Sequence, residues 1–144
     1  MKILLSFFVF FLISCSENVL DKKYTYSEEQ NLFLETLGWA GFEPSFIETT
    51  SLKDNLHVIF GYGGNILVSI GKDGTLIVDS QFPDSSPVIL RKIKELGGEK
   101  VDFVINTHFH FDHAEGNRAY GPMGADIYAH ENTLDYFRKG AYIN

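Results

Sequence analysis

Four side chains that can bind metal lie within six consecutive residues. The segment His108–His113 reads His-Phe-His-Phe-Asp-His and contains three of the five histidines of the chain. Neutral imidazole and carboxylate groups are ligands of divalent transition metals, and of zinc above all. In an extended segment, side chains two residues apart project to the same side, so His108 and His110 are expected to bind one ion together. Asp112 and His113 follow where the chain must bend, and they form a second pair for a neighbouring ion.

The residues before and after this cluster favour a metal site over the alternative, a histidine-rich surface loop without metal. Val101–Ile105 is a β-branched and aromatic run that predicts a strand, and the histidines begin two residues after it. In α/β proteins, sites form just past the carboxyl ends of strands. Gly116 closes the loop with a residue that tolerates unusual backbone shapes.

At this point the sequence resembles a known family. The segment Asn106–Asn117 resembles the signature loop of the metallo-β-lactamase-fold hydrolases. Gly64–Ile70 and Gly74–Asp79 resemble the strands that open this fold, and the resemblance extends from about Leu52 to Arg138. It implies an α/β (α+β) fold class, namely the N-terminal half of an αββα sandwich.

The resemblance also implies a ligand set. The first zinc is held by His108, His110 and a later histidine, and the second by Asp112, His113, a later histidine and usually a bridging aspartate. The sequence ends at Asn144, before those later ligands. We therefore expect a fragment, a truncated gene product, or a chain completed by a second half-domain or a dimer partner. A complete domain is expected to hold two zinc ions.

Other titratable residues are weaker candidates. The resemblance gives Asp79 a second-shell role in orienting the ligand histidines, and the alternative is a simple turn aspartate. Glu115 is expected to be a solvated loop residue, and His130 a helix-start or surface residue. His57 alternates with apolar neighbours on a predicted strand and is expected to be a surface or hydrogen-bonded histidine.

The chemistry follows from the metal. Zinc lowers the pKa of a bound water until hydroxide exists near neutral pH, and two ions can polarise a carbonyl or phosphoryl oxygen. Asp112 is the expected catalytic residue, because it can orient the nucleophile or carry its proton. The predicted reaction is hydrolysis of an ester, thioester, lactam or phosphoester in a small-molecule substrate. The alternative is a non-catalytic, membrane-tethered remnant that binds metal weakly or not at all.

Length and charge limit the other possibilities. The chain has 144 residues, which corresponds to one domain or less, and its 44% hydrophobic and 22% charged residues are ordinary for a globular protein. The formal net charge is -7, with no basic patch. An acidic surface of this kind argues against nucleic acid as a partner.

The N-terminus predicts a targeting segment. Lys2 is followed by the nearly continuous apolar run Ile3–Ile13, which suits a signal peptide and is too short for a membrane span. The stretch Leu12–Cys15 resembles the bacterial lipoprotein cleavage box, so the single cysteine, Cys15, is the expected lipidation site. The alternative is an ordinary secretory signal. The lipoprotein interpretation places the protein in the bacterial cell envelope, anchored on the periplasmic side.

These observations divide the chain into a signal peptide (1–14), a tether and N-terminal arm (15–50) and a partial metallo-β-lactamase-like domain (51–144). In the arm, Ser27 is expected to cap a short helix, and Trp39, Phe42 and Phe46 to pack against the domain. Hydrophobic periodicity predicts strands over 56–60, 65–70, 75–79, 101–105 and 126–129, and helices over 86–96, capped by Ser86, and 131–138.

Overall fold

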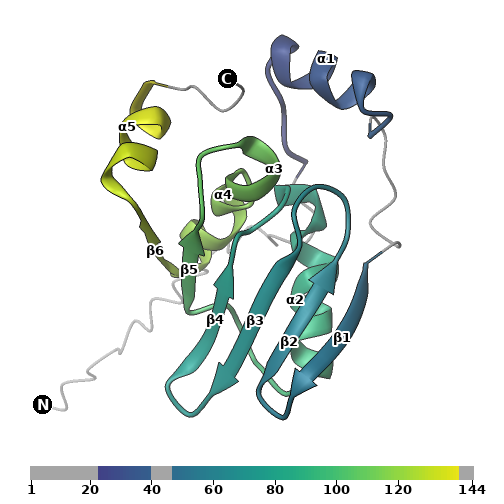
Figure 1. Cartoon of the computed structure of the whole chain (residues 1–144), viewed down its shortest axis with the longest axis vertical. Coiled ribbons are helices and arrows are strands. Elements are labelled where there is room, and N and C mark those ends of the chain that lie inside the picture. The colour runs from purple at the N-terminus through teal and green to yellow at the C-terminus, as the bar shows by residue number, and fades with distance from the viewer. Residues whose placement is uncertain (1–22, 40–46, 140–144) are drawn as a thin grey trace, which may run out of the picture.

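One mixed sheet with helices beside it forms the body of the chain (Figure 1). The computed structural model describes residues 23–39 and 47–139. Among these residues six strands form a single sheet in sequential order: β1 (Glu48–Lys53), β2 (Leu56–Phe60), β3 (Ile66–Gly71), β4 (Gly74–Val78), β5 (Phe103–Asn106) and β6 (Asp126–Ala129). The helices are α1 (Glu28–Thr36), α2 (Ser86–Glu95), α3 (Phe111–Ala114), α4 (Asn117–Tyr120) and α5 (Glu131–Lys139), with short 3-10 turns η3 (Pro83–Ser85) and η4 (Gly121–Met123). The predicted α/β fold class is confirmed.

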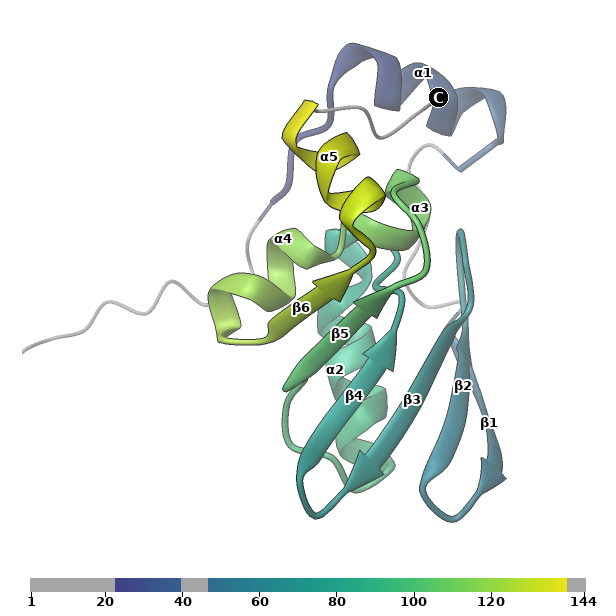
Figure 2. The same ribbon diagram turned by 60° about the vertical axis from the view of Figure 1, so that its left-hand side comes forward.

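The sheet changes from antiparallel to parallel halfway along the chain. Strands β1 to β4 pair antiparallel with their neighbours, whereas β4 pairs parallel with β5, and β5 with β6. Parallel neighbours need a crossover, which α2 supplies between β4 and β5. The carboxyl ends of β4, β5 and β6 consequently meet at one edge of the sheet (Figure 2).

One face of the sheet is buried against α2. Strands β2 and β4 alternate between buried and half-buried positions, which is the pattern of a sheet covered on one face. Ile89 and Ile93 of α2 are fully buried among inward-facing residues of the strands, which include Ile59, Val68, Ile77 and Val104. This core holds the carboxyl edge of the parallel strands in place.

Two details of the secondary structure differ from prediction. The cap of α2 is Ser85 and not Ser86, because η3 runs directly into the helix and Ser85 already has helical dihedral angles. Ser86 is therefore the first helical residue. Strand β1 was not predicted, because its Glu-Thr-Thr-Ser-Leu-Lys sequence lies at the sheet edge with almost every residue exposed and shows no hydrophobic alternation. It also crosses the expected boundary between arm and domain at residue 51.

The arm packs on the domain through its helix. Ser27 and Gln30 form the expected capping box at the start of α1. Beyond α1, Trp39 meets Phe82 edge-on at 6.2 Å between ring centroids, as expected for an arm that packs against the body. Phe42 and Phe46 lie outside the described residues, as do the predicted signal peptide and Cys15. In the described part of the chain, no helix has the length and apolar character needed to span a membrane.

Candidate metal centre

The metal loop, residues 107–116, begins where β5 ends and stands over the carboxyl edge of the parallel strands. Figures 1 and 2 both place α3 of this loop above the ends of β4 and β5. Residues 107–109 are bent and not extended, so strand alternation is not what brings His108 and His110 together. Their rings nevertheless lie 4.8 Å apart between centroids. The single turn of α3 then carries Asp112 and His113 back towards the same place.

The structure brings the predicted ligands together only in part: His108 and His113 share a cluster of donor atoms with Asp79, and His110 and Asp112 are not members of that cluster. The ring centroids of His108 and His113 are 4.1 Å apart, and Nε2 of His113 lies 3.4 Å from Oδ2 of Asp112. Two ligands that bind one tetrahedral zinc at about 2.1 Å lie about 3.4 Å from each other. The Asp112–His113 pair therefore already has the spacing of two ligands of one ion, and the donor set is one that zinc accepts.

Asp79 supports this cluster from the end of β4. Its Oδ2 accepts a hydrogen bond from Nδ1 of His113 at 2.8 Å, which leaves Nε2 of that ring facing Asp112. Both carboxylate oxygens also accept hydrogen bonds from Thr107, through its backbone N–H at 2.8 Å and its hydroxyl at 2.8 and 3.0 Å. A carboxylate that fixes the Nδ1 side of a histidine is typical of a residue that orients a metal ligand.

Asp79, His108 and His113 offer donor atoms that lie within 4.8 Å of one another. This geometry also admits Asp79 as a direct ligand. However, each carboxylate oxygen of Asp79 already accepts hydrogen bonds from other protein groups. Direct binding of a metal by Asp79 would break these hydrogen bonds or require the oxygen to be shared. The contacts therefore favour the orienting role that the sequence suggested for Asp79 over direct ligation.

The surroundings shift the pKa values of Asp79, His113 and His108 in different directions. Burial would raise the pKa of Asp79, but hydrogen bonds from His113 and Thr107 outweigh it and hold the pKa below its ordinary value. The same bond to Asp79 raises the pKa of His113, against the effect of burial. Burial and the charges of the two neighbouring histidines lower the pKa of His108. A lowered pKa favours the neutral imidazole, which is the form that binds metal.

Glu115 is buried, contrary to the prediction from the sequence. It was predicted to be a solvated loop residue, but it is 4% exposed. Its carboxylate accepts hydrogen bonds from Arg118 at 2.8 Å and from Gln30 of α1 at 3.4 Å, while Arg118 also donates to the carbonyl of Thr25. These contacts tie the arm to the metal loop, and they depend on tertiary packing that the local sequence does not reveal.

The scaffold behind the ligands contains residues that sequence reasoning missed. The carbonyl of His113 accepts hydrogen bonds from the backbone N–H of Ser80 at 2.7 Å and from its hydroxyl at 3.0 Å. Gly64 packs so closely on the imidazole of His113 that a Cβ at this position would overlap the ring. The glycines of 61–64 were predicted as turn formers, and nothing in their spacing indicated contact with His113.

The remaining histidines lie apart from the cluster. His130 is exposed at the start of α5, where its Nδ1 accepts a hydrogen bond from the backbone N–H of Asn132, as expected for a helix-start residue. His57 is 4% exposed, so it is not a surface residue. Its Nδ1 pairs with Ser51 at 2.9 Å, whereas its Nε2 is buried without a hydrogen-bond partner.

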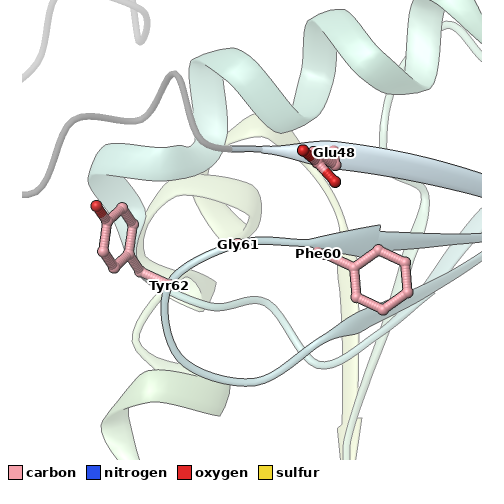
Figure 3. Close-up of a pocket in the computed structure, with 4 residues that line it drawn as sticks. All are labelled: Glu48, Phe60, Gly61 and Tyr62. Atoms are coloured by element: carbon pink, nitrogen blue, oxygen red, sulfur yellow. The ribbon is translucent and has the colours of Figure 1, made fainter.

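A cavity is lined in part by Gly61 and Tyr62, which belong to the loop of residues 61–64. Its volume is ≈ 260 Å³, and it is lined by Glu48, Phe60, Gly61 and Tyr62. Figure 3 shows the rings of Tyr62 and Phe60 on either side of Gly61, with the carboxylate of Glu48 on the neighbouring strand. The cavity therefore borders the loop that touches the metal cluster.

Comparison with known proteins agrees with this architecture. Residues 59–121 match the model of the metallo-beta-lactamase superfamily, a segment that runs from β2 through the metal loop. A probable metallo-hydrolase of Methanocaldococcus jannaschii is 33% identical over 58 residues, which are 40% of this chain and 28% of that protein.

Solved structures share the fold. A metallo-beta-lactamase with a HARLDQ motif from Cronobacter sakazakii (Enterobacter sakazakii) aligns with a TM-score of 0.58 and 21% identity, over 65% of this chain and 39% of that one. MEM-A1, a subclass B3 metallo-beta-lactamase from a soil metagenome library, aligns with a TM-score of 0.53 and 26% identity, over 63% and 36%. The fold is thus of the metallo-β-lactamase type. The chain spans well under half the length of these relatives.

Proposed function

We propose that this chain carries the N-terminal ligands of a zinc-dependent hydrolase of the metallo-β-lactamase superfamily. The observation that carries the proposal is the 3.4 Å separation between Nε2 of His113 and Oδ2 of Asp112, with Asp79 fixing the far side of the same imidazole. That separation matches two ligands of one zinc ion. A histidine-rich surface loop would have no need of a buried carboxylate behind it.

Each residue has a role in this proposal. His108 and His110 hold one ion, Asp112 and His113 hold the other, and Asp79 orients His113. The remaining ligands come from residues beyond this set, in a second half-domain or a dimer partner. Zinc, when bound, would supply an activated water and polarise the substrate oxygen. Asp112 would accept or return the proton of the attacking water.

The substrate is a small molecule with an ester, thioester, lactam or phosphoester bond. The relatives are named as metallo-hydrolases and β-lactamases, and a lactam is one member of this set. The net charge of -7 disfavours a nucleic acid substrate.

Hydrolysis by the zinc-loaded complete protein, with the second half-domain or partner that completes the ligand set, tests the proposal. We expect turnover of at least one substrate in a chromogenic panel of β-lactam, lactone, thioester and phosphodiester compounds. A chelator should abolish the turnover and added zinc should restore it. Because Asp112 handles the proton, Asp112→Asn should lower kcat about 10²–10⁴-fold. The matched control is Asp126→Asn, on exposed β6, which should keep the parental rate. A zinc-loaded protein that is inert towards the whole panel would instead support the non-catalytic remnant.

We also propose that the protein is anchored to a bacterial membrane through lipid on Cys15, which is the only cysteine in the chain. Support comes from the apolar run that ends at this residue. Intact mass spectrometry of the mature protein is expected to show a chain that starts at Cys15 and carries acyl groups, and Cys15→Ala should remain soluble after cell lysis. A mature N-terminus elsewhere, without lipid, would contradict this anchor.

A further inference from the structure

Two strained residues flank the turn that follows β4. Asp79 and Gln81 adopt positive φ angles of 65° and 52°, and they are the residues other than glycine that do so in the described part of the chain. Such a backbone shape persists only where the surrounding structure enforces it, and it concentrates at functional sites. The hydrogen bonds of Asp79 to the metal loop account for the first strained residue. The hydrogen bonds of Gln81 go to Gly64 and Gly116 and not to a predicted ligand, so its backbone shape needs its own explanation.

Gln81 bridges the two loops that meet at the metal cluster. Its side-chain Nε2 donates a hydrogen bond of 2.7 Å to the carbonyl of Gly64, and its backbone carbonyl accepts one of 2.7 Å from the N–H of Gly116. The first contact holds the glycine loop, residues 61–64. The second contact holds the end of the metal loop. Gln81 therefore connects the glycine loop to the metal loop and fixes the distance between them.

The glycine loop limits where two of the ligands can lie. Gly64 packs on the imidazole of His113 and donates a backbone hydrogen bond to the carbonyl of Asp112 at 3.4 Å. A Cβ on Gly63 would lie 2.9 Å from that of Asp112. A shift of the glycine loop away from the cluster would therefore free both side chains to move.

The buried amide of Gln81 is energetically unfavourable, which indicates that it has a specific role. The side chain is fully buried, and its Oε1 has no hydrogen-bond partner. An apolar side chain of the same size would avoid that unpaired polar atom. The amide is explained by the bond that it donates to Gly64.

From these contacts we propose that Gln81 is a positioning residue for the Asp112–His113 pair, which it places by holding the glycine loop against them. The inference rests on the proposed metal site. Gln81 is not itself a proposed ligand. It acts through its hydrogen bond to Gly64, while its backbone carbonyl accepts the hydrogen bond from Gly116.

Cobalt binding by Gln81→Met tests this role, because methionine keeps the size of the side chain and removes the amide. Titration of the metal-free protein with Co²⁺ alone, followed by its visible absorption, should show about tenfold weaker binding and an altered spectrum for the ion held by Asp112 and His113. The matched control is Thr75→Val, an isosteric change of a buried polar side chain at the amino end of β4, away from the metal loop. That variant should bind Co²⁺ as the parent does. Parental affinity and spectrum in folded Gln81→Met would overturn the proposal.

A second variant covers the case in which Gln81→Met does not fold. Gly61→Ala keeps Gln81 but places a Cβ 2.9 Å from its Oε1 and 3.1 Å from its Nε2, so the amide is displaced from Gly64. We expect the same weakening of Co²⁺ binding.

Hydrogen exchange in the metal-free protein tests the positioning role of Gln81 independently of metal binding, and therefore independently of the proposed function. Either variant should speed exchange of the backbone amides of Gly64 and His113, while the amides of α2 should exchange as in the parent. Unchanged exchange at Gly64 and His113 would overturn the positioning role even if the parent binds no Co²⁺. Failure of the parent to bind Co²⁺ would count against the proposed function and leave the exchange result to decide the role of Gln81.

Discussion

Replacing His108 and His110 together with alanine is expected to abolish binding of the first zinc ion. Both imidazoles are half-buried on the metal loop with centroids 4.8 Å apart, and the metal loop supplies no other histidine than His113. A catalytic zinc usually has three protein ligands, so loss of two leaves no site that holds the ion at micromolar concentrations. The zinc content of the purified complete protein, measured by plasma mass spectrometry, should fall by one ion per chain and hydrolysis should cease.

The fold should tolerate this double substitution. The two side chains lie outside the buried clusters, so the melting temperature of the metal-free protein is expected to stay close to that of the parent. His130→Ala is the matched control, because His130 is an exposed histidine whose Nδ1 accepts a hydrogen bond from the backbone of Asn132. It should retain the parental zinc content. Two zinc ions per chain in the double variant would show that the ligand assignment is wrong.

Local patterns account for what the sequence predicted well. The predicted ligands occupy six consecutive residues, so the bent start of the metal loop and the single turn of α3 keep them near one another. Strands β2, β3 and β4 were located because alternating burial and glycine-containing turns leave a short-range signal. Strand β6 was found from its β-branched and aromatic residues, although all its positions are exposed.

Tertiary contacts account for what the sequence did not predict. Glu115 is buried because Gln30 and Arg118 reach it, and Gln30 stands 85 positions earlier in the chain. Gln81 follows Asp79 in an unremarkable polar stretch, and its significance depends on a carbonyl 17 residues away. Polar residues such as these have no periodicity that would distinguish a buried partner from a solvated one. Local sequence therefore indicates candidate ligands more readily than the buried polar residues that support them.

Substituting Gly64 by alanine is expected to damage the metal centre, whereas the same change at Gly71 should have little effect. The two glycines stand at opposite ends of β3, two residues before it and at its last position. A Cβ at Gly64 would overlap the imidazole of His113, while a Cβ at Gly71 would meet nothing within 4 Å. Neither has a positive φ, so the difference between them is the steric conflict alone.

The ring of His113 must yield in Gly64→Ala, because the added carbon is fixed to the backbone. Movement of the ring breaks its hydrogen bond to Asp79 and separates Nε2 from Asp112. We expect the free energy of unfolding to fall by about 1–3 kcal/mol, as for other overpacked sites. Zinc affinity at the Asp112–His113 pair should fall about 10–100-fold, as when a supporting contact of a metal ligand is lost.

Calorimetric zinc titration and urea unfolding of both variants measure these effects. Gly71→Ala lies at an exposed turn and should match the parent within about 0.5 kcal/mol, with unchanged zinc affinity. If Gly64→Ala instead bound zinc as tightly as Gly71→Ala does, the imidazole of His113 would not need the position that Asp79 and Gly64 together impose on it. The assignment of that ring as a zinc ligand in this geometry would then have to be abandoned.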